Sequence, residues 1–373
     1  MLTARRRIRL CCLALVSLLV AAVPITAQGI PARLTDSEFW TMMADFSEPD
    51  GYFRSENFLS NETGFQGVIP ELQQTVRPGG VYFGVGPEQN FTYLVAVHPA
   101  MAFIIDIRHQ NAVQHLLYKA LMELYDNRVD FLCRLFSRPR PAGLAPGATV
   151  DAIFAAVDAA PRDSMLYYQT LAAVKDHLEK DHHFTLSPVE IQLLEHNFDV
   201  FYEAGPELSY NFNAGAGGGF GGRGRGMPNY TDLMVATDNA QTQRSYLATE
   251  ANYQLVRDME LRNLIVPLTG NFAGPKAIRA AGDYVRAHGA VVTVFYTSNV
   301  EQYLFQDGIW ADFARNVATL PLDSTSTFIR SGGGARGYGG GMRSSLLQSI
   351  TALLATFNGG KISTWQDVLE SSH

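Results

Sequence analysis

Short apolar runs alternate with longer amphipathic segments along most of the chain. The run at residues 102–105 is apolar and partly β-branched, as is typical of a buried strand in a parallel sheet. Residues 112–124 instead repeat apolar side chains at helical spacing on one face. Such patterns predict strands at residues 81–83, 102–105, 233–237, 264–268, 290–296 and 324–329. They predict helices at residues 35–46, 91–97, 112–124, 242–262, 275–288, 300–317 and 344–357. This alternation predicts an α/β fold, a Rossmann-like open and mostly parallel sheet with helices on both faces.

Other segments interrupt this alternation or precede it. Residues 128–205 are rich in Leu, Ala and Phe and carry no strand pattern, so we expect a helical insertion there. Residues 214–226 and 332–341 are rich in glycine and bury little apolar area, which predicts surface loops. Residues 28–78 precede the first strand and are expected to form an N-terminal arm. The α/β domain itself is expected over residues 79–373.

The first 27 residues have the pattern of a secretory signal peptide. Four arginines among residues 5–9 precede an apolar stretch, and small residues lead to Ala27. We therefore expect an exported bacterial protein, periplasmic or secreted. Two of the three cysteines, Cys11 and Cys12, lie in this peptide, so the mature chain would keep only Cys133 and form no internal disulfide.

The charge of the chain restricts the class of partner. The formal net charge is −7 at pH 7, and removal of the arginine-rich peptide would make it more negative. An acidic protein is a poor non-specific ligand for nucleic acid or for anionic membranes. No second apolar stretch is long enough to span a bilayer. A small molecule is the expected partner, and the pattern leaves the oligomeric state open.

Glycine and polar residues directly follow several predicted strands. Ligands of open α/β sheets bind beyond the carboxyl ends of the strands, so these residues form the candidate site. Gly84 and Gly86 let the backbone approach a ligand closely. Asp106 follows at the spacing of roughly twenty residues that suits an acid accepting bonds from ribose hydroxyls. The residues predicted to bind a ligand or cofactor are Gly84, Gly86, Glu88, Gln89, Asn90, Asp106, Arg108, Asn271 and Asn299.

Three acidic residues carry further expectations. Glu88 would place a negative charge beside the glycine turn, which disfavours a phosphate and suits a cationic ligand. Glu301 and Asp238 are the candidate catalytic bases, since each follows a predicted strand. Glu301 is also interpretable as a first-turn acid that interacts with the helix dipole, and this interpretation is slightly favoured. Asp238 is equally interpretable as a turn or helix-capping residue.

The glycine turn and the acid after the second strand resemble the class I S-adenosylmethionine-dependent methyltransferase superfamily. Gly84 and Gly86 match the two glycines of its cofactor loop, and Asp106 matches its ribose-binding acid. Tyr82 stands where that family has its first acid, and Glu88 stands where a third glycine is common. The resemblance covers roughly residues 60–125 and 230–330. The strings at residues 84–90, 103–108, 271–276 and 298–304 also resemble a bacterial group of uncharacterised methyltransferase-like proteins.

The resemblance implies S-adenosylmethionine as the cofactor and methylation of a small molecule as the reaction. Two alternatives remain open: a non-catalytic binding protein for a nucleoside or other polar ligand in the same cleft, and an interaction protein. A metal site is not expected. Asp181, His182 and His183 offer ligand atoms, but adjacent histidines on a helix point to different sides, which favours an exposed helix end.

Overall fold

The computed structural model describes residues 29–145, 147–210, 227–332 and 344–372. The expected signal peptide, residues 1–27, lies outside the described residues. So do the glycine-rich segment 214–226 and residues 333–341 of the second one. Within the described part of the chain, no helix has the length and apolar character needed to cross a membrane.

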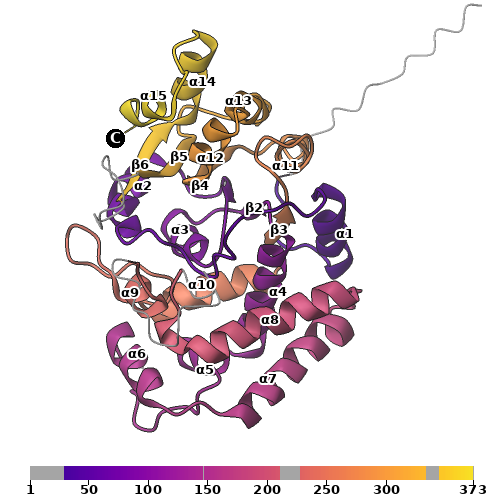
Figure 1. The fold of residues 1–373 in the computed structure, drawn as a ribbon, viewed down its shortest axis with the longest axis vertical. Coiled ribbons are helices and arrows are strands. Elements are labelled where there is room, and N and C mark those ends of the chain that lie inside the picture. Colours follow the sequence, from indigo (N-terminus) through magenta and orange to yellow (C-terminus); the bar gives the residue numbers. More distant parts are fainter. Residues whose placement is uncertain (1–28, 146, 211–226, 333–343, 373) are drawn as a thin grey trace, which may run out of the picture.

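A six-stranded sheet forms the centre of the molecule (Figure 1), with the strand order β3-β2-β1-β4-β5-β6. The first five strands run parallel, and β6 is antiparallel to β5. The strands are β1 Val81–Gly84, β2 Met101–Asp106, β3 Ile265–Thr269, β4 Val292–Ser298, β5 Thr327–Gly332 and β6 Ser344–Ser349. All residues of β1, β2 and β3 are buried, because helices cover both faces. The predicted mostly parallel α/β sheet is confirmed.

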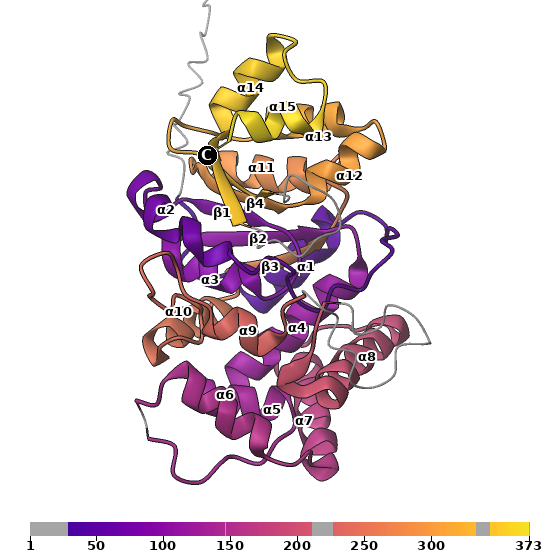
Figure 2. The same cartoon turned by 60° about the vertical axis from the view of Figure 1, so that its left-hand side comes forward.

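Helices lie on both sides of the sheet, as the view in Figure 2 shows. One side carries α3 Gln89–Val97, α4 His109–Leu124 and α10 Glu250–Leu261, with α2 Ile69–Thr75 packed on α3. The other side carries α11 Ala277–Ala287, α12 Val300–Gln306 and α13 Trp310–Val317, with α14 Ile350–Asn358 and α15 Trp365–Glu370 beyond them. Helix α1, Asp36–Phe46, packs against β3 at the edge of the sheet.

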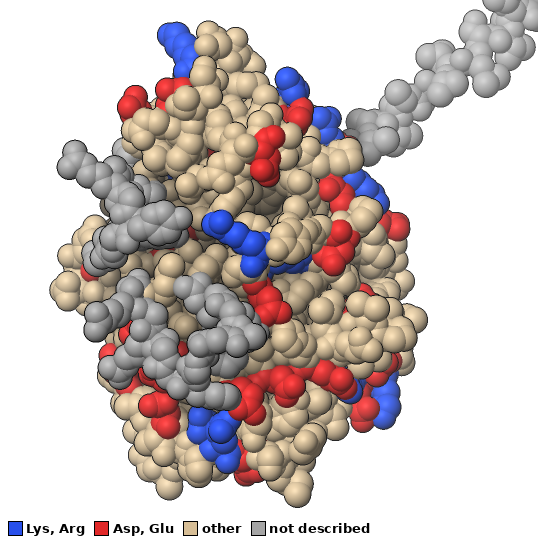
Figure 3. All heavy atoms as spheres, viewed as in Figure 1, with Lys and Arg blue, Asp and Glu red and all other residues tan. Residues whose placement is uncertain are grey.

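A block of helices packs against the outer side of α4 and is drawn at the bottom of Figure 1. Its elements are α5 Arg128–Leu135, α6 Val150–Ala159, α7 Ser164–Asp176, a π-helical turn His177–Asp181, α8 Pro188–Ala204 and α9 Tyr230–Val235. Short 3-10 turns occupy Phe65–Val68 and Gly205–Glu207. On the face shown in Figure 3, acidic side chains gather in a band over α8.

The strand predicted at residues 233–237 is wrong, because residues 233–235 form the second half of helix α9 and residues 236 and 237 lie beyond its end. Asn229 caps that helix by accepting from the backbone N–H of Asp232, and Asp232 reciprocates. The buried residues are Tyr230, Leu233 and Met234, which share one helical face. The apolar run of residues 233–235 is too short to show a helical period, so the sequence pattern resembled that of a strand.

The C-terminal predictions also need correction. The helix predicted at residues 344–357 begins instead with β6, and α14 starts only after Ser349, whose side chain caps it. The helix predicted at residues 300–317 is two helices, separated at Gly308, which has a φ of +71°. The helix predicted at residues 242–262 is confined to Glu250–Leu261, since Thr249 caps its start.

Candidate functional site

A cavity of about 290 Å³ lies at the carboxyl ends of the central strands. Its lining includes the loops that follow β1, β2, β3 and β4. The order of the strands reverses between β1 and β4, so the cavity lies at the topological switch point, where open α/β sheets bind ligands. Its volume is close to the lower end of the range for small-molecule sites, roughly 300–1,000 Å³.

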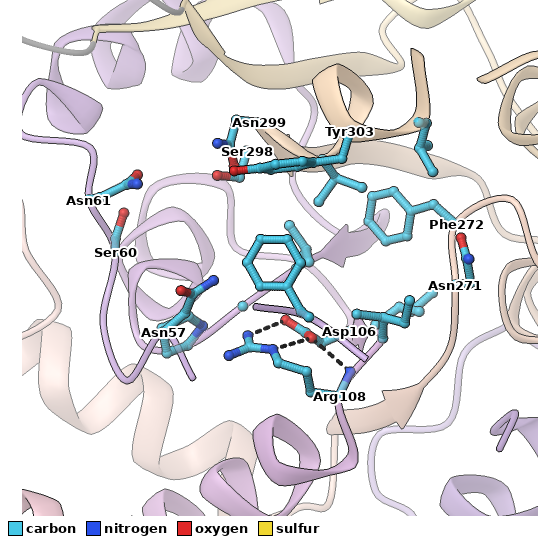
Figure 4. A pocket seen from close by; sticks show the side chains of 18 of the residues that line it. Asn57, Ser60, Asn61, Asp106, Arg108, Asn271, Phe272, Ser298, Asn299 and Tyr303 are labelled. Atoms are coloured by element: carbon cyan, nitrogen blue, oxygen red, sulfur yellow. Dashed lines mark hydrogen bonds and ion pairs between the residues drawn. The ribbon is translucent and has the colours of Figure 1, made fainter. Parts of the chain in front are cut away.

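Asp106 and Arg108 form an ion pair in the lining of the cavity (Figure 4). Arg108 Nε donates to Oδ1 of Asp106 at 2.9 Å, and its Nη2 donates to Oδ2 at 2.7 Å. The backbone N–H of Arg108 also donates to Oδ1 at 3.0 Å. The arginine therefore balances the charge of the acid predicted to bind ribose. Oδ1 thus has two donors and Oδ2 has one, so an acceptor position for a ligand remains on Oδ2.

The loop after β1 is shaped by one buried side chain, Asn90. Its Nδ2 donates to the carbonyls of Val85, Gly86 and Pro87 at 3.0, 3.1 and 2.7 Å. Its Oδ1 accepts from the hydroxyl of Tyr82 at 2.9 Å. Asn90 is fully buried and does not line the cavity, so its role is to hold the loop rather than to touch a ligand.

The two glycines of this loop are required for different reasons. Gly86 has a φ of +76°, a left-handed conformation that other residues adopt only with strain. Its carbonyl also accepts from His115 Nε2 at 2.9 Å. A Cβ on Gly84 would lie 2.0 Å from Oδ1 of Asn90. Gly84 therefore leaves room for the side chain that holds the loop.

Glu88 is buried beneath the loop and does not line the cavity. One carboxylate oxygen lies 3.5 Å from the backbone N–H of Ser60, and the other has no hydrogen-bond partner. Burial raises the pKa of Glu88 to about 8. Glu88 is thus mostly protonated near pH 7, and the expectation that it offers a negative charge to a ligand does not agree with its position.

We expect Glu88→Gln to stabilise the protein above pH 5. The folded-state pKa lies above the unfolded value near 4.5, so the wild-type loses stability as the pH rises from about 4.5 to about 8. The isosteric amide removes this loss, by about 3 kcal/mol near pH 7. Urea unfolding of both proteins at pH 4.5, 6 and 7.5 measures the effect. If the difference in unfolding free energy between Glu88→Gln and the wild-type does not vary with pH, titration of Glu88 is not its cause.

The N-terminal arm contributes a wall of the cavity that the sequence did not reveal. Phe53, Asn57, Ser60 and Asn61 line the cavity, and Figure 4 shows the last three on one side of it. Residues 55–57 and 60–62 are polar but follow no strand, so their position in the sequence did not indicate a site. Tyr303 of α12 lines the cavity nearby, with its ring centroid 5.1 Å from that of Phe53.

Glu62 joins this arm to the sheet. Its Oε1 accepts from Ser298 and Tyr296 at 2.6 and 3.0 Å, and its Oε2 accepts from Ser345 at 3.1 Å. Burial raises the pKa of Glu62, although these hydroxyl donors oppose the effect. Ser298 and Tyr296 line the cavity, whereas Glu62 does not. Glu62 therefore positions lining residues from β4.

The two candidate bases lie elsewhere. Glu301 is fully buried and forms an ion pair with Arg330, whose Nε lies 2.9 Å from Glu301 Oε1. Trp310 Nε1 donates to the other oxygen at 2.9 Å. Asp238 accepts from the backbone N–H groups of residues 240 and 242 and pairs with Arg244 at 2.6 Å. Neither Glu301 nor Asp238 lines the cavity, and both positions agree with the structural interpretation of these residues.

The structure thus divides the predicted residues into two groups. Six of them line the cavity: Gly86, Gln89, Asp106, Arg108, Asn271 and Asn299. The remainder do not line it: Gly84, Glu88, Asn90, Asp238 and Glu301. Position after a strand indicates the correct edge of the sheet, but it does not indicate the direction of the side chain.

Comparison with known proteins identifies a family without a known activity. The model of a domain of unknown function, DUF7790, matches residues 57–183 and 208–353. The match therefore includes the sheet, the loops at the strand ends and the arm from residue 57 onwards, with Asn57, Ser60 and Asn61 of the cavity lining. No curated protein matches the chain. The chain belongs to the DUF7790 family of domains of unknown function.

Proposed function

We propose that the cavity binds a nucleoside-type small molecule, with S-adenosylmethionine as the first candidate. The observation that carries this proposal is the meeting of the Gly86 turn and Asp106 in one cavity at the switch point of the sheet. The turn permits close approach of a ligand, and the acid is placed to accept hydrogen bonds from a ribose. Phe53, Phe272 and Tyr303 add aromatic surface suited to a planar base.

Methyl transfer to a small acceptor is the reaction that such a ligand would support. Among the described residues that line the cavity, the carboxylates are Asp106 and Asp307, and Asp106 is paired with Arg108. Methyl transfer depends mainly on alignment of the donor and the acceptor, and a reactive acceptor requires no base. The side-chain amides of Asn57, Asn271 and Asn299 would orient the two molecules.

Binding without reaction is the second candidate function. It is favoured by the position of Glu301 and Asp238, since neither proposed base lines the cavity. The aromatic and amide lining of the cavity would still recognise a nucleoside. The same variants test both functions, and only a methylation assay separates them.

The test is ligand-induced thermal stabilisation of the protein. S-adenosylmethionine or S-adenosylhomocysteine at millimolar concentration should raise the Tm, since a ligand at 100 times its Kd adds about 2.7 kcal/mol to stability. Asp106→Asn should remove most of this increase. Asp283→Asn, which alters an exposed carboxylate on α11, is the matched control and should keep it. The absence of any shift in the wild-type protein would refute the proposed ligand.

Replacement of Arg108 distinguishes a nucleoside from an anionic ligand. Arg108→Gln removes the cation that holds Asp106, so the acid becomes free to bind ribose hydroxyls. S-adenosylhomocysteine should therefore bind Arg108→Gln at least as well as it binds the wild-type. An anion held by the guanidinium would instead lose its main partner. Isothermal titration calorimetry measures the affinity of the wild-type and of Arg108→Gln for S-adenosylhomocysteine and for inorganic phosphate.

A further inference from the structure

A second cluster of ionisable side chains lies where the helical block meets α4. Glu123, His177 and His182 each offer one ligand atom, and these atoms lie within 4.8 Å of one another. Glu123 comes from the last turn of α4, and the histidines lie at the two ends of the π-helical turn. None of the three lines the cavity at the switch point, so this cluster is a separate site.

The π-helical turn brings the two histidines together. Residues five positions apart on an α-helix point to different sides, because one turn takes 3.6 residues. Here the backbone N–H of His182 donates to the carbonyl of His177 at 3.0 Å, which closes one wide turn. The two rings lie edge to face, with their centroids 4.7 Å apart. Such π turns are frequent at functional sites.

The hydrogen bonds of the two rings indicate where their protons lie. Nδ1 of His177 lies 2.8 Å from Oδ2 of Asp181, and Nδ1 of His182 lies 2.8 Å from Oδ1 of Asp36. An ionised carboxylate only accepts, so each Nδ1 is the donor. In a neutral ring, Nε2 then presents its lone pair. Both Nε2 atoms face Oε2 of Glu123, at 2.7 and 2.5 Å.

Two Nε2 lone pairs directed at one carboxylate oxygen repel it, unless a cation lies between them or both rings are protonated. A histidine that binds a metal usually donates its other ring N–H to a carboxylate, which is the arrangement of both rings here. Lys119 Nζ donates to Oε1 of Glu123 at 2.7 Å, leaving Oε2 for an ion. Asn263 Nδ2 donates to Asp36 at 2.8 Å and so orients that carboxylate.

We propose that Glu123, His177 and His182 bind a divalent transition-metal ion, zinc in the first instance. Two imidazoles and one carboxylate oxygen are a common zinc donor set, and they leave a fourth position for water. Zinc bonds of about 2.0–2.1 Å hold tetrahedral ligands roughly 3.3 Å apart. Each Nε2 must therefore move away from Glu123 Oε2 by less than about an ångström. The bound ion would connect α4 to the turn after α7.

The test uses the full mature chain without a histidine tag, stripped with a chelator and titrated with zinc. Calorimetry should show one zinc per chain, and zinc should raise the Tm. His177→Ala and His182→Ala should each weaken binding at least tenfold. His183→Ala is the matched control, because this exposed histidine is the immediate neighbour of His182 and should leave binding unchanged.

Two results would overturn the proposal. The first is a wild-type protein that binds no zinc at stoichiometric concentration, which would show that the histidines are protonated partners of Glu123. The second is a His182→Ala variant that binds zinc as tightly as His183→Ala. If the alanine variants do not fold, the wild-type titration alone decides, and cobalt spectra of the wild-type report whether nitrogen ligands are present.

Discussion

Arg330→Met will lower the free energy of unfolding by about 3–5 kcal/mol, the cost of leaving one charge of a buried ion pair without its partner. Arg330 and Glu301 both have side chains that are 0% exposed, and the pair lies between β5 and α12. Arg330 also donates to Gln348 of β6, and its guanidinium lies 4.6 Å from the centroid of the Phe328 ring. Urea unfolding followed by circular dichroism measures the change.

Two further variants test whether the loss of stability in Arg330→Met comes from a buried charge without a partner. Arg315→Met removes a cation from an exposed pair with Asp312 and should change stability by less than about 1 kcal/mol. The double variant Arg330→Met with Glu301→Leu should recover much of the loss, because no buried charge remains. A Glu301→Gln variant of wild-type stability that fails to bind ligand would contradict the structural role assigned to Glu301.

Asn90→Ala will cost about 3 kcal/mol of stability, because it leaves several buried polar groups without partners. The carbonyls of Val85, Gly86 and Pro87 lose their common donor, and the Tyr82 hydroxyl loses its acceptor. The loop that lines the cavity should then lose its shape. Ligand-induced stabilisation should therefore fall together with the Tm of the free protein.

Asn358→Ala is the control for this variant, because Asn358 is an exposed residue at the end of α14. Its effect should stay within about 0.5 kcal/mol. Thermal unfolding with and without S-adenosylhomocysteine separates the two effects of Asn90→Ala. An Asn90→Ala protein that keeps full ligand stabilisation would show that the cavity tolerates a rearranged loop.

The parallel part of the sheet could be predicted because the sequence of a buried strand is itself recognisable. Each of β1, β2 and β3 is an uninterrupted apolar run, and a glycine or polar residue marks its end. Helix α9 and strand β6 were missed because their apolar runs are too short to show a period, so caps and long-range pairing decide their structure. Predictions from pattern work where local sequence and tertiary packing agree.

The cavity was only partly predictable, for a related reason. Asp106 and Gly86 follow strands, so chain topology alone brings them to the same edge of the sheet. Asn57 and Ser60 belong to an arm whose place depends on long-range hydrogen bonds such as those of Glu62 to β4. The pair of His177 and His182 depends on a π turn, which no helical period of 3.6 residues reveals.

The strand order has a consequence for how the chain folds. Strands β1 and β4 are neighbours in the sheet, with Val81 beside Val292, yet every element from α3 to α11 separates them in the chain. Pairing them closes a very long loop before the contacts can compensate for the lost chain entropy. During synthesis, the edge of β1 that pairs with β4 must therefore stay unpaired until β4 has been made. The switch-point cavity is thus among the last parts of the molecule to form.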